Sequence, residues 1–359
     1  MTKRLLLLNG LAALMVVINH MASYGFQALF FWTDRYLPVT VPNFDQRGSL
    51  TYYFLLLIHQ LAEYAIPAFL FVSGYFIAFT ARGSKGGVTA DFVSSRIKKL
   101  LGPFLFWSVV VIILLRRFPP DFQQIMTMYY FIPLIIQFYL LSPVIVPLAR
   151  DRWKLLLVLA AILQLGIESL RLLSTLGVAL PGLHLMIGLT PIWFFPGKLL
   201  YFSIGVVAGF HYKEMGAWLS SVKWILLGVT VGLLALSIVE YETLTQLSSR
   251  EFVVSEFSGM SRTLYAISFV LTYLAFDKVR YPFKSQLTDL GAQSLGIYFV
   301  NTPAIYVAAV LMYRLTPWIL GYQLLYLPIL FVFGLGAPLL LMKLAVQTPA
   351  RRVYSYVFG

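Results

Sequence analysis

The chain has 359 residues, of which 60% are hydrophobic and only 11% are charged. Soluble domains carry about 25% charged residues, so this composition excludes an ordinary soluble fold. The absence of cysteine excludes disulfides, thiolate catalysis and cysteine-based metal sites. A formal net charge of +13 would suit nucleic-acid binding, but the basic residues lie mainly between apolar runs, where lipid headgroups explain them more simply.

Apolar runs recur along the whole chain, and each is long enough as a helix to cross about 30 Å of hydrocarbon. The sequence therefore predicts an all-α polytopic membrane bundle of about ten transmembrane helices, forming one integral-membrane domain over 1–359. The first run outlasts the apolar region of a secretory signal peptide and is interpreted as a helix. The predicted spans are approximately 5–31, 52–80, 100–115, 125–148, 154–175, 186–210, 222–239, 260–276, 291–313 and 318–343.

The basic residues orient this bundle, because loops rich in Lys and Arg stay in the cytoplasm. Placing the N-terminus inside puts most of the 27 Lys and Arg residues on the cytoplasmic side. We therefore predict that both termini are cytoplasmic.

Three ionisable residues within the first two spans are the best candidates for a functional site. His20 lies in the first span, roughly 16 Å below its outer end by the helical rise. His59 and Glu63 lie in the second span, about 12 and 18 Å below the same surface. An ionisable group at such depth is costly unless it faces protein, water or a partner, so it marks a candidate functional site.

His59 and Glu63 are four residues apart and therefore share a helix face. A carboxylate beside an imidazole fixes its tautomer, as a general base requires. The alternative is a buried polar pair that joins helices. His184 and His211 lie near span ends, where a structural role is favoured, and two histidines with one glutamate show no metal-binding spacing. No metal is predicted.

A basic cluster follows the second span and leads into the third. It comprises Arg82, Lys85, Arg96, Lys98 and Lys99. Such a cluster can bind the phosphates of coenzyme A through charge-assisted hydrogen bonds. It can equally bind anionic lipid headgroups or simply set the topology.

Several segments in order along the chain resemble motifs of the integral-membrane acyltransferase 3 family. The similar segments are Asn9-Gly10-Leu11 leading to His20, residues 67–78, residues 96–103 with Trp107, residues 129–143 with Gln137-Phe138-Tyr139-Leu140 near their end, Tyr201-Phe202-Ser203-Ile204-Gly205 with Gly209, and residues 291–303. The resemblance covers nearly the whole chain. Family members transfer acyl groups, usually acetyl, from coenzyme A to sugars and polysaccharides across the membrane.

The resemblance implies that His20 is the essential histidine and that acetyl-CoA or another acyl-CoA is the donor. It implies a sugar, polysaccharide or glycolipid acceptor and a prokaryotic plasma membrane. The substrate-contacting or structural polar residues would be Asn9, Gln137, Tyr139 and Asn301. The chain departs from the family pattern at two positions. Asn9 stands where the family often has arginine, and Asn301 replaces a late histidine and cannot titrate.

These observations favour one mechanism. His20 would take the proton from an acceptor hydroxyl as it attacks the thioester, in a ternary complex, since no cysteine is present to carry the acyl group. Arg82, Arg96, Lys98 and Lys99 would bind the donor, and Glu63 or His59 would orient His20. The alternative is a transporter or sensor that uses His20, His59 and Glu63 as a polar or proton pathway.

Overall fold

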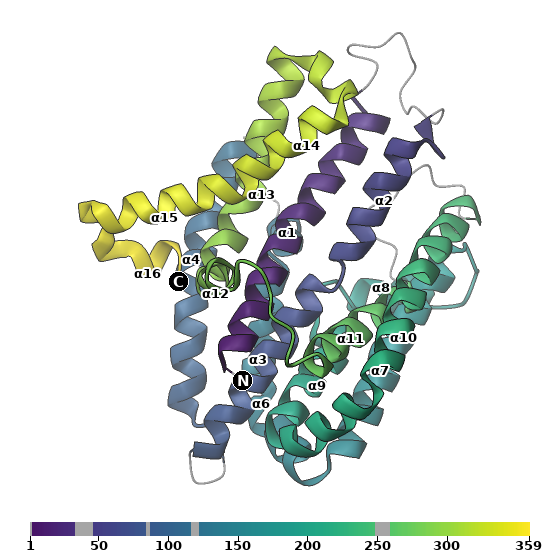
Figure 1. The fold of residues 1–359 in the computed structure, drawn as a ribbon, viewed down its shortest axis with the longest axis vertical. Helices are drawn as coiled ribbons and strands as arrows, with labels where there is room; N and C mark the ends of the chain where they lie inside the picture. The colour runs from purple at the N-terminus through teal and green to yellow at the C-terminus, as the bar shows by residue number, and fades with distance from the viewer. Residues whose placement is uncertain (1, 33–45, 84–86, 116–121, 248–258) are drawn as a thin grey trace.

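The computed structural model describes residues 2–32, 46–83, 87–115, 122–247 and 259–359, and within these ranges every regular element is helical. The helices are α1 (Thr2–Phe30), α2 (Leu50–Ala62), α3 (Ala65–Gly83), α4 (Ala90–Leu115), α5 (Phe122–Met128), α6 (Phe131–Asp151), α7 (Trp153–Thr175), α8 (Leu183–Leu189), α9 (Leu199–Phe210), α10 (Tyr212–Leu247), α11 (Met260–Ala275), α12 (Lys284–Ala292), α13 (Ser294–Leu315), α14 (Gln323–Phe331), α15 (Ala337–Gln347) and α16 (Tyr354–Val357) (Figure 1). Short 3₁₀-helices lie at η3 (Phe195–Lys198), η4 (Pro317–Gly321) and η6 (Pro349–Val353), and a π-helical turn lies at η5 (Val332–Gly336).

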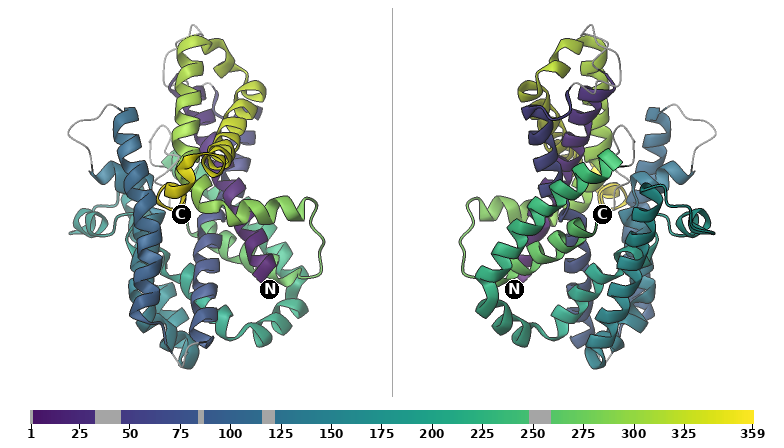
Figure 2. Two further views of the ribbon diagram at one scale, coloured as in Figure 1. Left: turned by 90° about the vertical axis from the view of Figure 1, so that its left-hand side faces the viewer. Right: turned by 90° about the vertical axis from the view of Figure 1, so that its right-hand side faces the viewer.

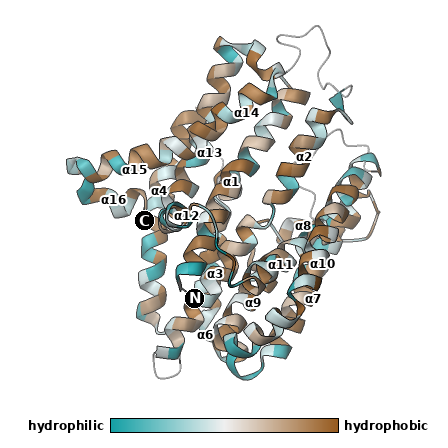
Figure 3. Cartoon of the chain, in the orientation of Figure 1, coloured by the Kyte–Doolittle hydropathy of each residue, from teal (hydrophilic) through white to brown (hydrophobic). Residues whose placement is uncertain are grey.

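The polytopic all-α bundle predicted from the sequence is confirmed. Eight helical segments of the described residues, with α2–α3 and α14–α15 each counted as one, are long and apolar enough to cross a membrane. The remaining two predicted spans correspond to shorter elements. Residues 186–210 are divided into α8, η3 and α9, and residues 260–276 form the 16-residue α11. Many large apolar side chains of the helices are exposed, as lipid contact requires. The ribbon coloured by hydropathy is hydrophobic along much of the helices (Figure 3).

Proline and glycine explain where the continuous spans are interrupted. The predicted span 52–80 breaks at Glu63 and Tyr64, just before α3, because Pro67 has no N–H to continue the helix and tolerates only a first-turn position. Residues 186–210 break after α8, where Pro191 and Pro196 interrupt the hydrogen-bond ladder. Both interruptions expose irregular backbone inside the bundle, which a membrane protein tolerates only beside protein or a water-filled cavity.

α1 runs through the centre of the molecule and packs against α2, α3, α12, α13 and α14 (Figure 1). α4 runs along one side of the molecule, and α12 lies toward the other side (Figure 2). The C-terminal α16 packs on α4, where the indole N–H of Trp107 donates to the Val357 carbonyl at 2.8 Å.

Glycines in the motif segments mark the closest helix crossings. A Cβ atom added at Gly205 of α9 would lie 2.1 Å from the Phe71 carbonyl oxygen of α3, and one at Gly74 would lie 2.4 Å from the Phe202 carbonyl oxygen. A Cβ at Gly10 would lie 1.7 Å from the Leu287 carbonyl oxygen of α12. These motif glycines therefore serve backbone-to-backbone packing, as small residues commonly do between membrane helices.

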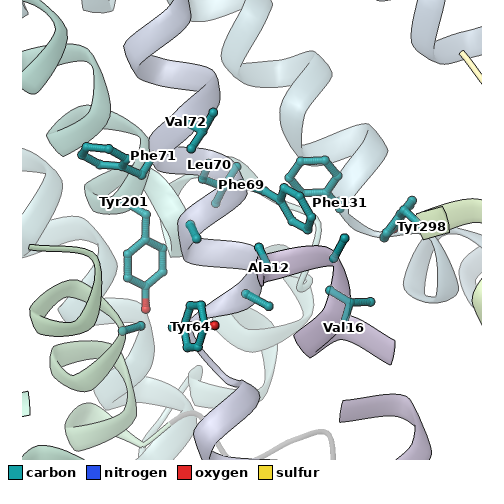
Figure 4. Packing of buried hydrophobic residues seen from close by; sticks show 14 of the residues in the cluster. Ala12, Val16, Tyr64, Phe69, Leu70, Phe71, Val72, Phe131, Tyr201 and Tyr298 are labelled. Atoms are coloured by element: carbon teal, nitrogen blue, oxygen red, sulfur yellow. The ribbon is translucent and has the colours of Figure 1, made fainter. Parts of the chain in front are cut away.

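Aromatic side chains fill the core beside these crossings (Figure 4). The rings of Phe138 and Phe202 stack with centroids 4.4 Å apart, and those of Tyr64 and Phe269 stack at 3.6 Å. Tyr64 occupies the α2–α3 break, so this stacking fixes the interruption in place.

Candidate functional site

A cavity of about 590 Å³ lies among α1, the α2–α3 break, α5, α7, the α8–η3 segment and α11. Its walls are rich in polar and ionisable side chains. Those that matter below are His20, His59, Glu63, Tyr130, Arg171, Lys198 and Arg262. The three residues that the sequence singled out within the first two spans therefore line one cavity, and both helix interruptions contribute to its wall.

The ring of His20 is held from α13. Its Nδ1 lies 2.6 Å from Oδ1 of Asn301 and 3.2 Å from Oγ1 of Thr302. The Asn301 amide N–H₂ donates to the carbonyls of Ile297 at 2.7 Å and Tyr298 at 2.8 Å, so its oxygen faces the histidine. Nδ1 of His20 therefore carries the proton, and Nε2 keeps its lone pair.

Nε2 of His20 has no hydrogen-bond partner among the described residues, and the His20 side chain is half-buried at the cavity wall. This is the arrangement of a general base, in which one ring nitrogen is fixed by an acceptor and the other is free to take a proton. Asn301, fully buried behind the ring, occupies the orienting position that Glu63 or His59 were expected to fill.

Pro303 changes the hydrogen bonding of α13 next to Asn301. It has no N–H, so the carbonyl of Phe299 loses its partner in the helix and instead accepts from the Tyr129 hydroxyl at 3.2 Å. Asn301 lies in the turn before Pro303. The late motif therefore builds a rigid, hydrogen-bonded platform behind His20.

His59 and Glu63 form a pair on one face, as their spacing predicts. Nδ1 of His59 lies 3.6 Å from Oε1 of Glu63, and the same oxygen lies 3.3 Å from Nη1 of Arg262. Arg262 is in the first turn of α11, whose start is held by the Glu240 carboxylate through the N–H groups of Met260 and Ser261. The Glu63 charge is thus balanced by Arg262, a cation that the sequence analysis did not single out as a site residue.

Arg171 and Lys198 are the other cavity residues that sequence reasoning missed. Arg171 lies near the end of α7 and donates to the Thr190 carbonyl, while Nζ of Lys198 lies 5.6 Å from the ring centroid of Tyr201. The sequence could have indicated them, because Arg171 and Lys198 lie inside apolar runs. A charged residue at such a position marks a candidate functional site for the same reason that His20 does.

The other polar residues singled out from the motifs lie outside the cavity wall. Gln137 bonds the carbonyls of Pro133 and Trp193 through Nε2 and accepts from the N–H of Phe195, so it supports the segment that carries Lys198. Tyr139 is half-buried in the core on α6. Asn9 lies on α1, beside Gly10 and its crossing with α12.

Arg4 does not take the place of the arginine that Asn9 replaces. Its guanidinium donates to the carbonyls of Tyr273 and Phe276 at the C-terminal end of α11, and it lies 4.9 Å above the Tyr273 ring. A cation at this position satisfies terminal helix carbonyls. Arg4 therefore anchors α11 to α1.

The basic cluster lies away from the cavity wall. Arg96, Lys98 and Lys99 are exposed on the first three turns of α4, with the Arg96 guanidinium 5.1 Å from the Phe92 ring. Arg82 donates to the Phe210 carbonyl and lies over the rings of Phe210 and Tyr212. Lys85 lies outside the described residues.

His184 and His211 do not line the cavity. His184 is exposed on α8, and His211 contacts the Ala149 carbonyl at 3.2 Å and Glu214 at 3.5 Å. Across the described ranges, no three His, Asp or Glu side chains form a potential metal site. That no metal takes part stays a prediction.

The fold and the cavity define a polytopic membrane protein with a half-buried histidine, held by Asn301, in the wall of a polar cavity. Residues 4–343 match the family model of the acyltransferase 3 family, described as an acyltransferase domain. The chain therefore belongs to this family and is a membrane acyltransferase, so the transporter or sensor interpretation is wrong. Comparisons with curated proteins and with solved structures find no match.

Proposed function

We propose that this protein moves an acyl group, most simply acetyl, from cytoplasmic acyl-CoA to a hydroxyl of a sugar, polysaccharide or glycolipid on the other side of a prokaryotic plasma membrane. One domain over 1–359 would do this. The observation that carries the proposal is the orientation of His20, whose Nδ1 is bonded to Asn301 at 2.6 Å while Nε2 remains available to the cavity.

His20 is the general base in this proposal. Nε2 accepts the proton of the acceptor hydroxyl as the oxygen attacks the thioester carbonyl, and the oxygen–carbon bond forms. The carbon–sulfur bond then breaks, and the imidazolium returns its proton to the leaving thiolate, giving free coenzyme A and the acylated acceptor. General-base catalysis of this kind is typically worth about 10² to 10⁴ in rate.

The remaining site residues have supporting roles in this scheme. Asn301 holds the tautomer of His20, and Glu63 with His59 sets the charge of the cavity wall beside Arg262. Arg96, Lys98 and Lys99 would bind the phosphates of acyl-CoA; their exposure at one end of α4 leaves them available for this. Arg82, which is engaged with α9 and α10, would contribute by holding that end of the bundle together.

The test is acetyl-CoA titration by calorimetry on the purified protein in detergent, followed by detection of free thiol with candidate glycosides. We expect saturable acetyl-CoA binding that weakens when Arg96, Lys98 and Lys99 are changed to Gln. His20→Gln should abolish transfer while binding of acetyl-CoA persists.

His184→Gln is the matched control, because it removes an exposed histidine that lies outside the cavity. Wild-type turnover in His20→Gln would remove this histidine from the mechanism. Absence of acetyl-CoA binding by folded wild-type protein would contradict the proposed donor.

A further inference from the structure

The cavity that contains His20 carries more positive than negative charge. Arg171, Lys198 and Arg262 line it from α7, η3 and α11, whereas Glu63 is the one acidic residue among the described lining residues. Glu168 is buried nearby without lining the cavity, and its carboxylate accepts from Thr263 at 2.7 Å and Gln164 at 3.3 Å. Even with Glu168 included, the cations outnumber the carboxylates by three to two.

The three cations are not equivalent. Arg262 is paired with Glu63 at 3.3 Å, so its charge is compensated inside the protein. Arg171 bonds only a backbone carbonyl, that of Thr190, and Lys198 has no hydrogen bond or ion pair among the described residues. Glu168 interacts electrostatically with both Arg171 and Lys198 but forms a salt bridge with neither among the described residues. With Glu63 paired to Arg262, the two cations share this one carboxylate, and such an excess of positive charge in a membrane-embedded cavity is costly unless a ligand supplies an anion.

The position of the cations indicates which substrate brings that charge. The predicted orientation, with the N-terminus inside, places the end of α7, which carries Arg171, and the first turn of α11, which carries Arg262, toward the outer side. Arg96, Lys98 and Lys99 lie on the first three turns of α4, which the predicted orientation places on the cytoplasmic side. A donor whose phosphates bind at Arg96 to Lys99 enters from the cytoplasmic side, so we assign Arg171 and Lys198 to the acceptor, which comes from the outer side.

We propose that the acceptor is an anionic glycan or glycolipid, and that Arg171 and Lys198 bind its carboxylate or phosphate group beside His20. This deepens the function proposed above and rests on it. The planar guanidinium of Arg171 can donate two hydrogen bonds to a carboxylate or phosphate, and the ammonium of Lys198 can bind the same anion as a compact charge. Hydroxyl groups of Ser174, Thr175 and Tyr130 on the same wall suit the neutral part of a sugar.

The test compares three hexoses that differ in charge. Methyl glucuronoside carries a carboxylate, glucose 6-phosphate carries a phosphate, and methyl glucoside is neutral. Binding to the detergent-solubilised protein is measured by calorimetry without donor, at low and high salt. We expect at least one anionic hexose to bind about tenfold more tightly than methyl glucoside, with an affinity that falls as salt rises.

Arg171→Gln and Lys198→Gln should each weaken binding of the anionic hexose by about tenfold or more, because each removes a charged hydrogen-bond donor. Lys154→Gln is the matched control. Lys154 is an exposed lysine 5.5 Å from the ring centroid of Trp153, much as Lys198 is 5.6 Å from Tyr201, but it does not line the cavity. Thermal unfolding of each variant verifies folding, and the two cavity variants provide independent readouts.

The outcomes separate this proposal from the proposed function. Equal affinity for charged and neutral hexoses, or binding of none, overturns the anionic acceptor even if acetyl-CoA binds. If Arg171→Gln and Lys198→Gln weaken acetyl-CoA binding instead, the anion belongs to the donor and the acceptor assignment is overturned. If anionic hexoses bind as expected but acetyl-CoA does not, the acyl donor of the proposed function fails while the anionic site stands.

Discussion

At the scale of single residues, the site depends on one hydrogen bond behind His20. Asn301 cannot titrate, and it stands where the family pattern has a histidine, so the sequence alone indicates that an ionisable group is missing there. In the structure, its amide oxygen meets Nδ1 of His20 at 2.6 Å and its N–H₂ group is committed to two carbonyls of α13. A neutral amide is sufficient to fix the histidine tautomer, as the asparagine of Cys-His-Asn proteases illustrates.

Replacing Asn301 with Leu should lower turnover by about tenfold to a hundredfold, because Nδ1 of His20 loses its acceptor. This loss is smaller than the whole rate effect of general-base catalysis, since His20 itself remains. Acetyl-CoA affinity should be unchanged. Asn301→His should retain most activity and add a second ionisation to the pH profile of kcat/KM, which a purely structural residue would not do. Full activity in Asn301→Leu would show that His20 needs no orientation from α13.

Glu63→Gln should lower thermal stability, because it leaves Arg262 and His59 without their carboxylate. Breaking a fully buried ion pair costs about 3–5 kcal/mol, and we expect less here because both side chains reach the cavity. Unfolding in detergent is the measurement. The double variant Glu63→Gln with Arg262→Gln should recover part of the loss; no recovery would mean that the pair is not coupled.

At the scale of elements, the interruptions of helices matter more than their lengths. Pro67 ends the continuous second span and Pro191 and Pro196 divide the sixth, and the residues at both breaks line the cavity. Hydropathy detected the apolar runs but not the breaks, because a sliding apolar pattern continues across a proline. The proline positions were visible in the sequence and would have predicted the breaks.

Packing of α3 on α9 should depend on glycine at the crossing. Gly205→Ala should destabilise the protein by about 1–3 kcal/mol, because the new methyl group would overlap the Phe71 backbone and neither helix can move without disturbing the core. Gly228→Ala is the matched control, since a Cβ there meets nothing within 4 Å. Equal melting temperatures of the two variants would contradict the close crossing.

At the scale of the whole molecule, the proposed function requires Arg96, Lys98 and Lys99 to lie on the cytoplasmic side and the cavity with Arg171 and Lys198 to open to the outer side. The native chain has no cysteine, so single cysteines can be introduced without background labelling. We expect an impermeant maleimide to label Leu185→Cys from outside, and Ser95→Cys and Val353→Cys only after permeabilisation. Labelling of Ser95→Cys from outside would reverse the orientation and the proposed entry of the donor.

The sequence by itself determined the membrane class, the apolar spans, the pairing of His59 with Glu63 and the prominence of His20, because these follow from composition and local spacing along a helix. Only the tertiary structure decided that Asn301 holds His20, that Arg262 neutralises Glu63 and that Arg171 and Lys198 share their cavity. His20 and Asn301 are 281 residues apart along the chain, so their contact exists only because α1 and α13 pack together. Local sequence patterns determine which side chains share a face of one helix, whereas the packing of helices determines which side chains of different helices come into contact.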